Sequence, residues 1–112
     1  MWVRVGSFEG RIKDGDIARF RSAIEQVFID GMAQCSGVQG ARAFWPHDFD
    51  DDSASKIVCQ VMVEYADRDG MIAVQQSDER NAVIERLARE VLPMFDGKIV
   101  HVNYECDVRQ PS

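Results

Sequence analysis

The sequence predicts an α+β domain in which two helices cover one face of a four-stranded antiparallel sheet. Four segments alternate apolar and polar residues with the period of a strand, and two repeat apolar residues with the period of a helix. Their order is strand, helix, strand, strand, helix, strand. A chain of 112 residues has room for one such pair of layers. We therefore expect a single domain over residues 1–112, with its core in 2–106 and a short tail in 107–112.

The first half of the chain supplies two strands and a helix. Residues 2–9, WVRVGSFE, alternate and contain β-branched and aromatic side chains, which predicts a strand. From Asp16, a residue type suited to the N-cap, apolar residues at helical spacing predict an amphipathic helix that ends near Gly31. Residues 39–45 are bounded by glycines and predict the second strand, which Pro46 should end because proline cannot donate to a ladder.

The second half repeats the pattern after an acidic loop. Residues 56–66, KIVCQVMVEYA, form the clearest strand and predict a hairpin with the strand before them. A short helical segment at 71–77 precedes a longer amphipathic helix that ends within 93–97. Residues 98–105, KIVHVNYE, alternate again and predict the last strand. This βαββαβ order is that of the ferredoxin-like folds.

Strand alternation divides the sheet into a side facing the helices and an open side. If the apolar side of each strand packs under the helices, Val100, Val102 and Tyr104 face them from the last strand. Val3 and Val5 do so from the first strand. The open side then combines Arg4, Arg42, Gln60, Glu64, His101, Asn103 and Glu105 with Trp2, Phe8, Phe44, Val58 and Met62.

The two middle segments are divided in the same way. The third strand presents Ile57, Cys59, Val61, Val63 and Tyr65 to the helices. For the second strand, we expect Ala41, Ala43 and Trp45 to lie under the helices, but the register, and with it the facing of Arg42 and Trp45, stays open.

The mixed side suggests a covered, polar cavity. If this face were fully solvated, its large apolar groups would be exposed to water. If it were a dry core, its charged groups would have no solvent. A second copy of the chain is the simplest element that could cover this face. We therefore expect a symmetric homodimer that encloses a space for a small-molecule ligand.

The candidate catalytic residues are His101, Arg4 and Glu64. In the strand order 4-1-3-2, Arg4 can meet Glu64 on one side and His101 or Asn103 on the other. His101 suits a general base or proton shuttle, and Arg4 suits an oxyanion. The candidate ligand-binding residues are Arg42, Gln60, Asn103, Phe44 and Met62. The alternative is that these polar groups only satisfy one another inside a dimer interface.

A metal site is not expected. Asp48, Asp50 and Asp52 begin like a calcium-binding loop, but Ser53 and Cys59 stand where that loop needs Gly and Glu. The segment is therefore predicted to be a solvated acidic hairpin.

The net charge and the cysteine content indicate which partners and which cellular compartment are favoured. The net charge of −6 disfavours nucleic acid and anionic membranes, and there is no apolar run of the roughly 20 residues that cross a bilayer. Cys35, Cys59 and Cys106 form no CxxC pair, which favours reduced thiols in the cytoplasm.

Residues 65–105 resemble the second half of EthD-like and antibiotic-biosynthesis-monooxygenase-like proteins, in the dimeric α/β-barrel superfamily. In both, an aromatic strand end leads to a broken helix, an F-x-G turn (Phe95 to Gly97 here) and a last strand. The likeness covers nearly all of residues 2–106 and implies ferredoxin-like protomers whose sheets pair into a barrel. Residues 67–96 contain no His, which the haem-degrading members carry there, so no cofactor is expected.

The resemblance implies a small-molecule-binding dimeric barrel protein. It favours a cofactor-independent monooxygenase-like or isomerase-like enzyme acting on a carbonyl or phenolic compound. A noncatalytic ligand-binding or stress-associated protein of the same fold is one alternative, and a purely structural dimer is the other.

Overall fold

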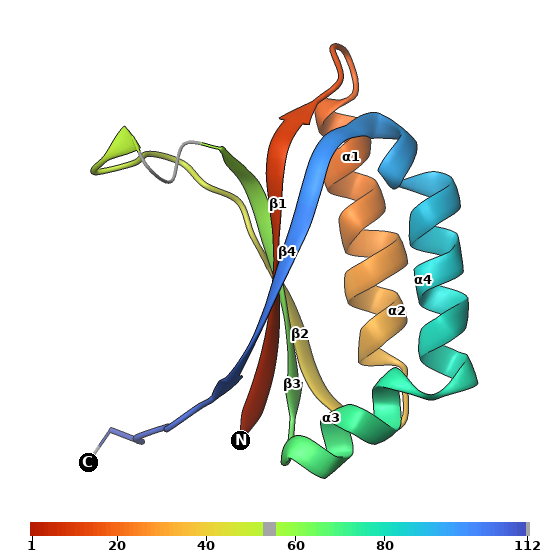
Figure 1. Cartoon of the computed structure of the whole chain (residues 1–112), viewed down its shortest axis with the longest axis vertical. Coiled ribbons are helices and arrows are strands. Elements are labelled where there is room, and N and C mark those ends of the chain that lie inside the picture. Colours follow the sequence, from red (N-terminus) through yellow and green to blue (C-terminus); the bar gives the residue numbers. More distant parts are fainter. Residues whose placement is uncertain (53–55, 112) are drawn as a thin grey trace.

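The computed structural model describes residues 1–52 and 56–111, and its elements follow the predicted order (Figure 1). Ser53, one of the positions compared with a calcium loop, lies outside the described residues. Four strands form one antiparallel sheet in the order β2-β3-β1-β4: β1 (Trp2–Ile12), β2 (Val38–Phe44), β3 (Ile57–Tyr65) and β4 (Phe95–Glu105). The helices cover one face of this sheet and leave the other open (Figure 1). The predicted fold class and strand order are confirmed.

The helical layer consists of two helical regions. The first joins α1 (Ile17–Ala23), a π-helical segment η1 (Ile24–Ile29) and α2 (Asp30–Ala33). The second region holds α3 (Arg68–Gln75), α4 (Asp78–Glu90) and a 3₁₀ turn η3 (Leu92–Met94). None of the helices in the described part of the chain has the length and apolar content that a membrane crossing requires.

Side chains cap the N-termini of α3 and α4. The carboxylate of Asp67 accepts from the Gly70 amide at 2.7 Å, and the Ser77 hydroxyl accepts from the Arg80 amide at 3.2 Å. Asp16 does occupy the N-cap position of α1, but its carboxylate accepts from the Arg19 guanidinium at 3.0 Å and makes no capping bond.

β1 and β4 are longer than predicted, at the point where two glycines face each other. Gly10 of β1 pairs with Gly97 of β4, with φ of +149° and +157°. A Cβ on either glycine would collide with backbone of the facing strand. The close approach allows the ladder to continue to Ile12 and Phe95, through segments that were predicted to be turns.

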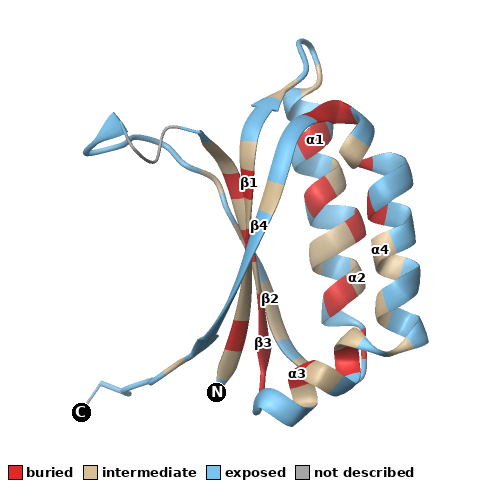
Figure 2. Ribbon diagram, viewed as in Figure 1, coloured by how far each residue is buried: buried red, intermediate tan, exposed pale blue. Residues whose placement is uncertain are grey.

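Aromatic rings form the centre of the core between sheet and helices. Phe8 of β1 meets Phe20 of α1 edge-on at 5.7 Å between ring centroids, and Phe95 at 5.3 Å. Trp45 meets Phe20 at 6.2 Å, so it lies under the helices as expected. Figure 2 shows the buried residues gathered where the two layers meet.

The predicted facing is correct for β2 and β3 and wrong for β1 and β4. Val63 of β3 lies on the helix side, and directly opposed residues share a face. Its partner Ala41 therefore faces the helices as predicted, and its other partner, Arg4, also faces them, against the prediction. Gly6 and His101 likewise pair on the helix side. In contrast, Val100, Val102 and Tyr104 lie on the open face, 36%, 42% and 47% exposed.

The burial of Phe8 explains the reversal. This ring is 1% exposed and packs against Phe20 and Phe95, which commits its side of β1 to the helices. Side chains alternate along a strand, so Trp2 and Arg4 follow Phe8 to the helix side, and Glu105 follows through its pairing with Trp2.

Candidate functional site

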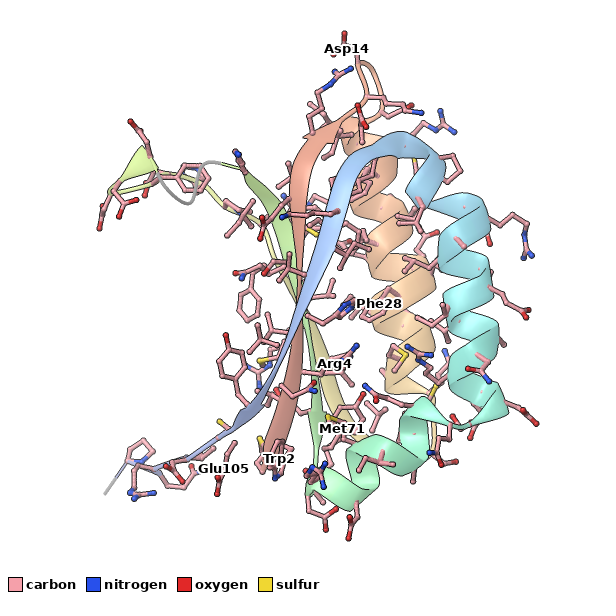
Figure 3. All side chains as sticks on the ribbon, viewed as in Figure 1. Trp2, Arg4, Asp14, Phe28, Met71 and Glu105 are labelled. Atoms are coloured by element: carbon pink, nitrogen blue, oxygen red, sulfur yellow. The ribbon has the colours of Figure 1, made fainter. Side chains whose placement is uncertain are left out.

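A cavity of about 200 Å³ lies between the sheet and the helices. Its walls are mainly apolar and include Phe8, Phe28, Met32, Val61, Ile84 and Leu87. The polar side chains that line it are Arg4, His101, Arg80, Gln75 and Tyr65. Figure 3 shows Arg4 and Phe28 in the space between the two layers. Residues of the chain's own helices form one wall of this cavity, so Arg4 and His101 do not lie on the open face, where a partner chain was expected to cover them.

The sheet contributes a histidine and an arginine from neighbouring strands. His101 of β4 pairs with Gly6 of β1, and the missing side chain leaves room for the imidazole to lie over the strand. A Cβ at position 6 would stand 3.3 Å from His101 Cδ2 and 3.4 Å from Nε2. Two residues earlier in β1, Arg4 Nη1 donates to Asn103 Oδ1 at 3.0 Å. The pairing of Gly6 with His101 and of Arg4 with Asn103 therefore sets the positions of both functional groups.

The helices contribute two further polar groups at the junction of α3 and α4. Arg80 lies in the first turn of α4, where the Ser77 hydroxyl accepts from its backbone amide. The same hydroxyl donates to the Val74 carbonyl at 2.6 Å, which ties the end of α3 to the start of α4. Gln75 is the last residue of α3, and its buried Nε2 has no hydrogen-bond partner among the described residues.

The polar groups of the cavity influence one another electrostatically. His101 is exposed as a residue, but the partial burial of its imidazole lowers the pKa, and the positive charges of Arg4 and Arg80 lower it further. Burial also lowers the pKa of the Arg4 guanidinium, with Arg80 adding to the effect. Burial raises the pKa of Tyr65, against the opposing effect of both arginines. The imidazole is therefore neutral at pH 7 and able to accept a proton.

Three of the predicted site residues lie together and the others do not. Arg4 and His101 line the cavity, and Asn103 holds the Arg4 guanidinium. Glu64 faces the opposite side of the sheet, because it pairs with Val3. The predicted meeting of Arg4 with Glu64 is therefore wrong.

The remaining candidates occupy the open face with Glu64. Arg42 Nε lies 2.9 Å from Glu64 Oε1, and Gln60 Nε2 donates to Ser7 Oγ at 2.9 Å. Phe44 and Met62 share that face, since Phe44 pairs with Gln60 and Met62 with Arg42. On this face, then, Arg42 and Glu64 are paired with each other and Gln60 is paired with Ser7.

Sequence reasoning missed Arg80 and Gln75, although a signal was present. Arg80 stands four residues before Ile84 and seven before Leu87, within the apolar stripe of the helix. Gln75 stands four residues after Met71, which is buried. A polar residue inside an apolar stripe marks a group that must find a partner beneath the helix.

Metal ligands do not gather in the described residues. Within 1–52 and 56–111, no three His, Cys, Asp or Glu side chains are arranged so that they could hold a metal ion.

No family model matches the chain, and comparison with characterised proteins finds no match in sequence. Solved structures do match in fold. An EthD family protein from Bacillus halodurans is 11% identical, with a TM-score of 0.67, over 96% of this chain and 100% of that chain. SnoaB, a cofactor-independent oxygenase from Streptomyces nogalater, is 13% identical, with a TM-score of 0.64, over 99% of this chain and 97% of that chain.

A dimeric ferredoxin-like protein of unknown function from Jannaschia is also similar. It is 15% identical, with a TM-score of 0.65, over 94% of this chain and 98% of that chain. Antibiotic biosynthesis monooxygenases are among the other similar structures. At these identities the likeness concerns the fold, and at that level the resemblance to EthD-like and antibiotic-biosynthesis-monooxygenase-like proteins is confirmed.

Proposed function

We propose that the cavity is a small-molecule site in which His101 acts as a general base on a carbonyl or phenolic compound, without a cofactor. The observation that carries this proposal is an imidazole of lowered pKa beside two guanidinium groups in a mainly apolar cavity. A neutral base can remove a proton, and neighbouring cations stabilise the anion that remains.

The chemistry follows from the protonation states. His101 takes a proton from an acidic C–H or O–H bond of the substrate, which leaves an imidazolium and an enolate or phenolate. Arg4, held by Asn103, stabilises the oxygen that gains the charge. The mainly apolar walls lower the local dielectric constant, which strengthens these interactions.

The fate of the anion distinguishes two reaction classes. Return of the proton to a different carbon gives an isomerisation, in which nothing is oxidised. Reaction of the carbanion with dioxygen, the oxidant, forms a C–O bond, and the peroxide takes up the proton from the imidazolium. Cleavage of its O–O bond with loss of water then leaves a new carbonyl group, which is a monooxygenation. A cofactor-independent oxygenase among the similar structures supports the second class by analogy of fold.

Solvent deuterium exchange tests the base. We expect His101→Gln to slow exchange at the acidic carbon of a single-ring 1,3-diketone by roughly 100-fold or more, the usual contribution of a general base. His47→Gln is the matched control, because His47 is the second of the two histidines and is exposed in the loop after β2. Equal exchange in the wild type and His101→Gln would remove His101 from the proposed role.

A noncatalytic ligand-binding protein is the second candidate. It is favoured by the absence of any carboxylate from the described residues that line the cavity, since catalytic histidines are often oriented by one. Binding of phenols without exchange or turnover of any probe would select this candidate.

We further propose a homodimer formed through the open face. Val100, Val102, Tyr104 and Phe44 are exposed there, and exposed apolar groups gathered on one face often mark an interaction surface. Two similar structures are described as dimeric ferredoxin-like proteins. A dimer in the wild type and a monomer in Val102→Asp are expected from solution mass, whereas a stable wild-type monomer would contradict the proposal. The three free cysteines support a reducing compartment such as the cytoplasm.

A further inference from the structure

Among the residues that the structure describes, two arginines line the cavity and no carboxylate does. Arg4 donates to the neutral amide of Asn103, and Arg80 has no ion-pair partner among the described residues. Arg86, on the same helix as Arg80, pairs with Glu90. The chain as a whole carries a net charge of −6, so the positive charge of the cavity is a local feature. Cations in a partly desolvated site favour a negatively charged occupant.

The unpaired amide of Gln75 adds a hydrogen-bond requirement. Its Nε2 is buried, has no partner among the described residues and belongs to a side chain that lines the cavity. A buried donor without an acceptor is destabilising and is rare in folded proteins. An oxygen atom on the occupant would satisfy it.

The volume limits the size of the occupant. A dry cavity of about 150 Å³ can hold benzene, whereas drug-sized ligands need roughly 300 Å³ or more. The cavity here is about 200 Å³ and has apolar walls that include Phe28, Ile84 and Leu87. One ring with short polar substituents fits this space.

We propose that the site takes a single-ring carboxylate that also bears a hydroxyl or keto oxygen. Its carboxylate binds Arg4 and Arg80, its ring lies against the apolar walls, and its second oxygen accepts from Gln75. This inference rests on the proposed function and narrows its substrate class: the ligand enters as an anion, and His101 acts on the hydroxyl or the acidic carbon.

Benzoate and benzamide form the critical pair of probes, because they have nearly the same shape and differ in charge. We expect benzoate to bind wild-type protein roughly 10-fold more tightly in calorimetric titration, as charge-assisted hydrogen bonds are stronger than neutral ones. Arg80→Gln should weaken benzoate binding more than benzamide binding, and the preference that remains is the part that Arg4 supplies. Arg80→Lys should restore part of the preference for benzoate.

Arg89→Gln is the matched control for charge. Arg89 is exposed, lies on α4 with Arg80 and is not among the residues that line the cavity. Its replacement removes the same charge from the same helix and should leave benzoate binding unchanged. Should Arg80→Gln fail to fold, the wild type still decides, because added salt should weaken benzoate and not benzamide.

The second oxygen is tested separately. At least one of the ortho, meta and para hydroxybenzoates should bind more tightly than benzoate, and Gln75→Leu should abolish that gain. If none does, the role assigned to Gln75 is wrong.

The outcomes separate this inference from the proposed function. If benzamide binds as tightly as benzoate, the ligand is not selected as an anion, while the cavity remains a small-molecule site. If neither probe binds at millimolar concentration, both the inference and the proposed site are overturned.

Discussion

Replacing Gly6 by Ala tests whether the strand backbone positions the imidazole of His101. The new Cβ would stand 3.3 Å from His101 Cδ2 and 3.3 Å from Val61 Cγ2. Comfortable carbon contacts begin at about 3.5 Å, so the ring must move by a few tenths of an ångström. Overpacking typically costs about 1–3 kcal/mol, and the reduced freedom of the unfolded chain returns about 0.4–1 kcal/mol. Because the ring can shift into the cavity, we expect a net loss near the low end, about 1 kcal/mol.

Two measurements separate the local effect from the global one. Urea denaturation should report the small loss of stability. NMR should show displaced imidazole resonances of His101. The affinity for benzoate should fall by about 10-fold, because small misplacements of a functional group are costly.

Gly40→Ala is the control on the opposite face of the sheet. A Cβ there would stand 3.2 Å from Glu64 Oε2, the end of a side chain that can swing aside. We expect that variant to leave the resonances of His101 and the affinity for benzoate unchanged. Identical spectra for Gly6→Ala and the wild type would refute the positioning role of Gly6.

Three further predictions concern the core, the thiols and pH. Phe20→Ala should lower the free energy of unfolding by about 3–5 kcal/mol in urea denaturation, because the ring is fully buried. The control is Ile17→Ala on the same helix, where Ile17 is 67% exposed and the change should be less than about 0.5 kcal/mol. Similar losses in the two variants would contradict the packing. Burial raises the pKa of Cys59 to about 12, so iodoacetamide should alkylate the partly exposed Cys106 first and Cys59 only after denaturation; comparable rates would show that Cys59 is accessible. The pKa of His101 is lowered in the fold, so the unfolded chain binds more protons between that pKa and the ordinary 6.5, and stability falls as pH drops through this window. His101→Gln should lose less stability over the same window, and an unchanged pH dependence would show that the pKa of His101 is not lowered in the fold.

The order of the elements could be predicted from the sequence because it depends on local patterns. Alternation identified four strands, helical spacing identified the helical regions, and glycine, proline and acidic residues marked the connections. The same alternation divided each strand into two sets of side chains. His101 and Asn103 were placed in one set and Val100 and Val102 in the other, and the structure keeps that division.

Which set faces the helices was decided only by the tertiary structure. In β1 and β4 both sides carry apolar groups, so hydrophobicity alone does not distinguish the core from the open face. The packing of Phe8 against Phe20 and Phe95 settles the question, and the ladder then carries Arg4 and His101 under the helices. There the two side chains meet Arg80 and Gln75, which come from a distant part of the chain. A period of two is symmetric between the faces of a sheet, and only the burial of a particular ring against a particular helix breaks that symmetry.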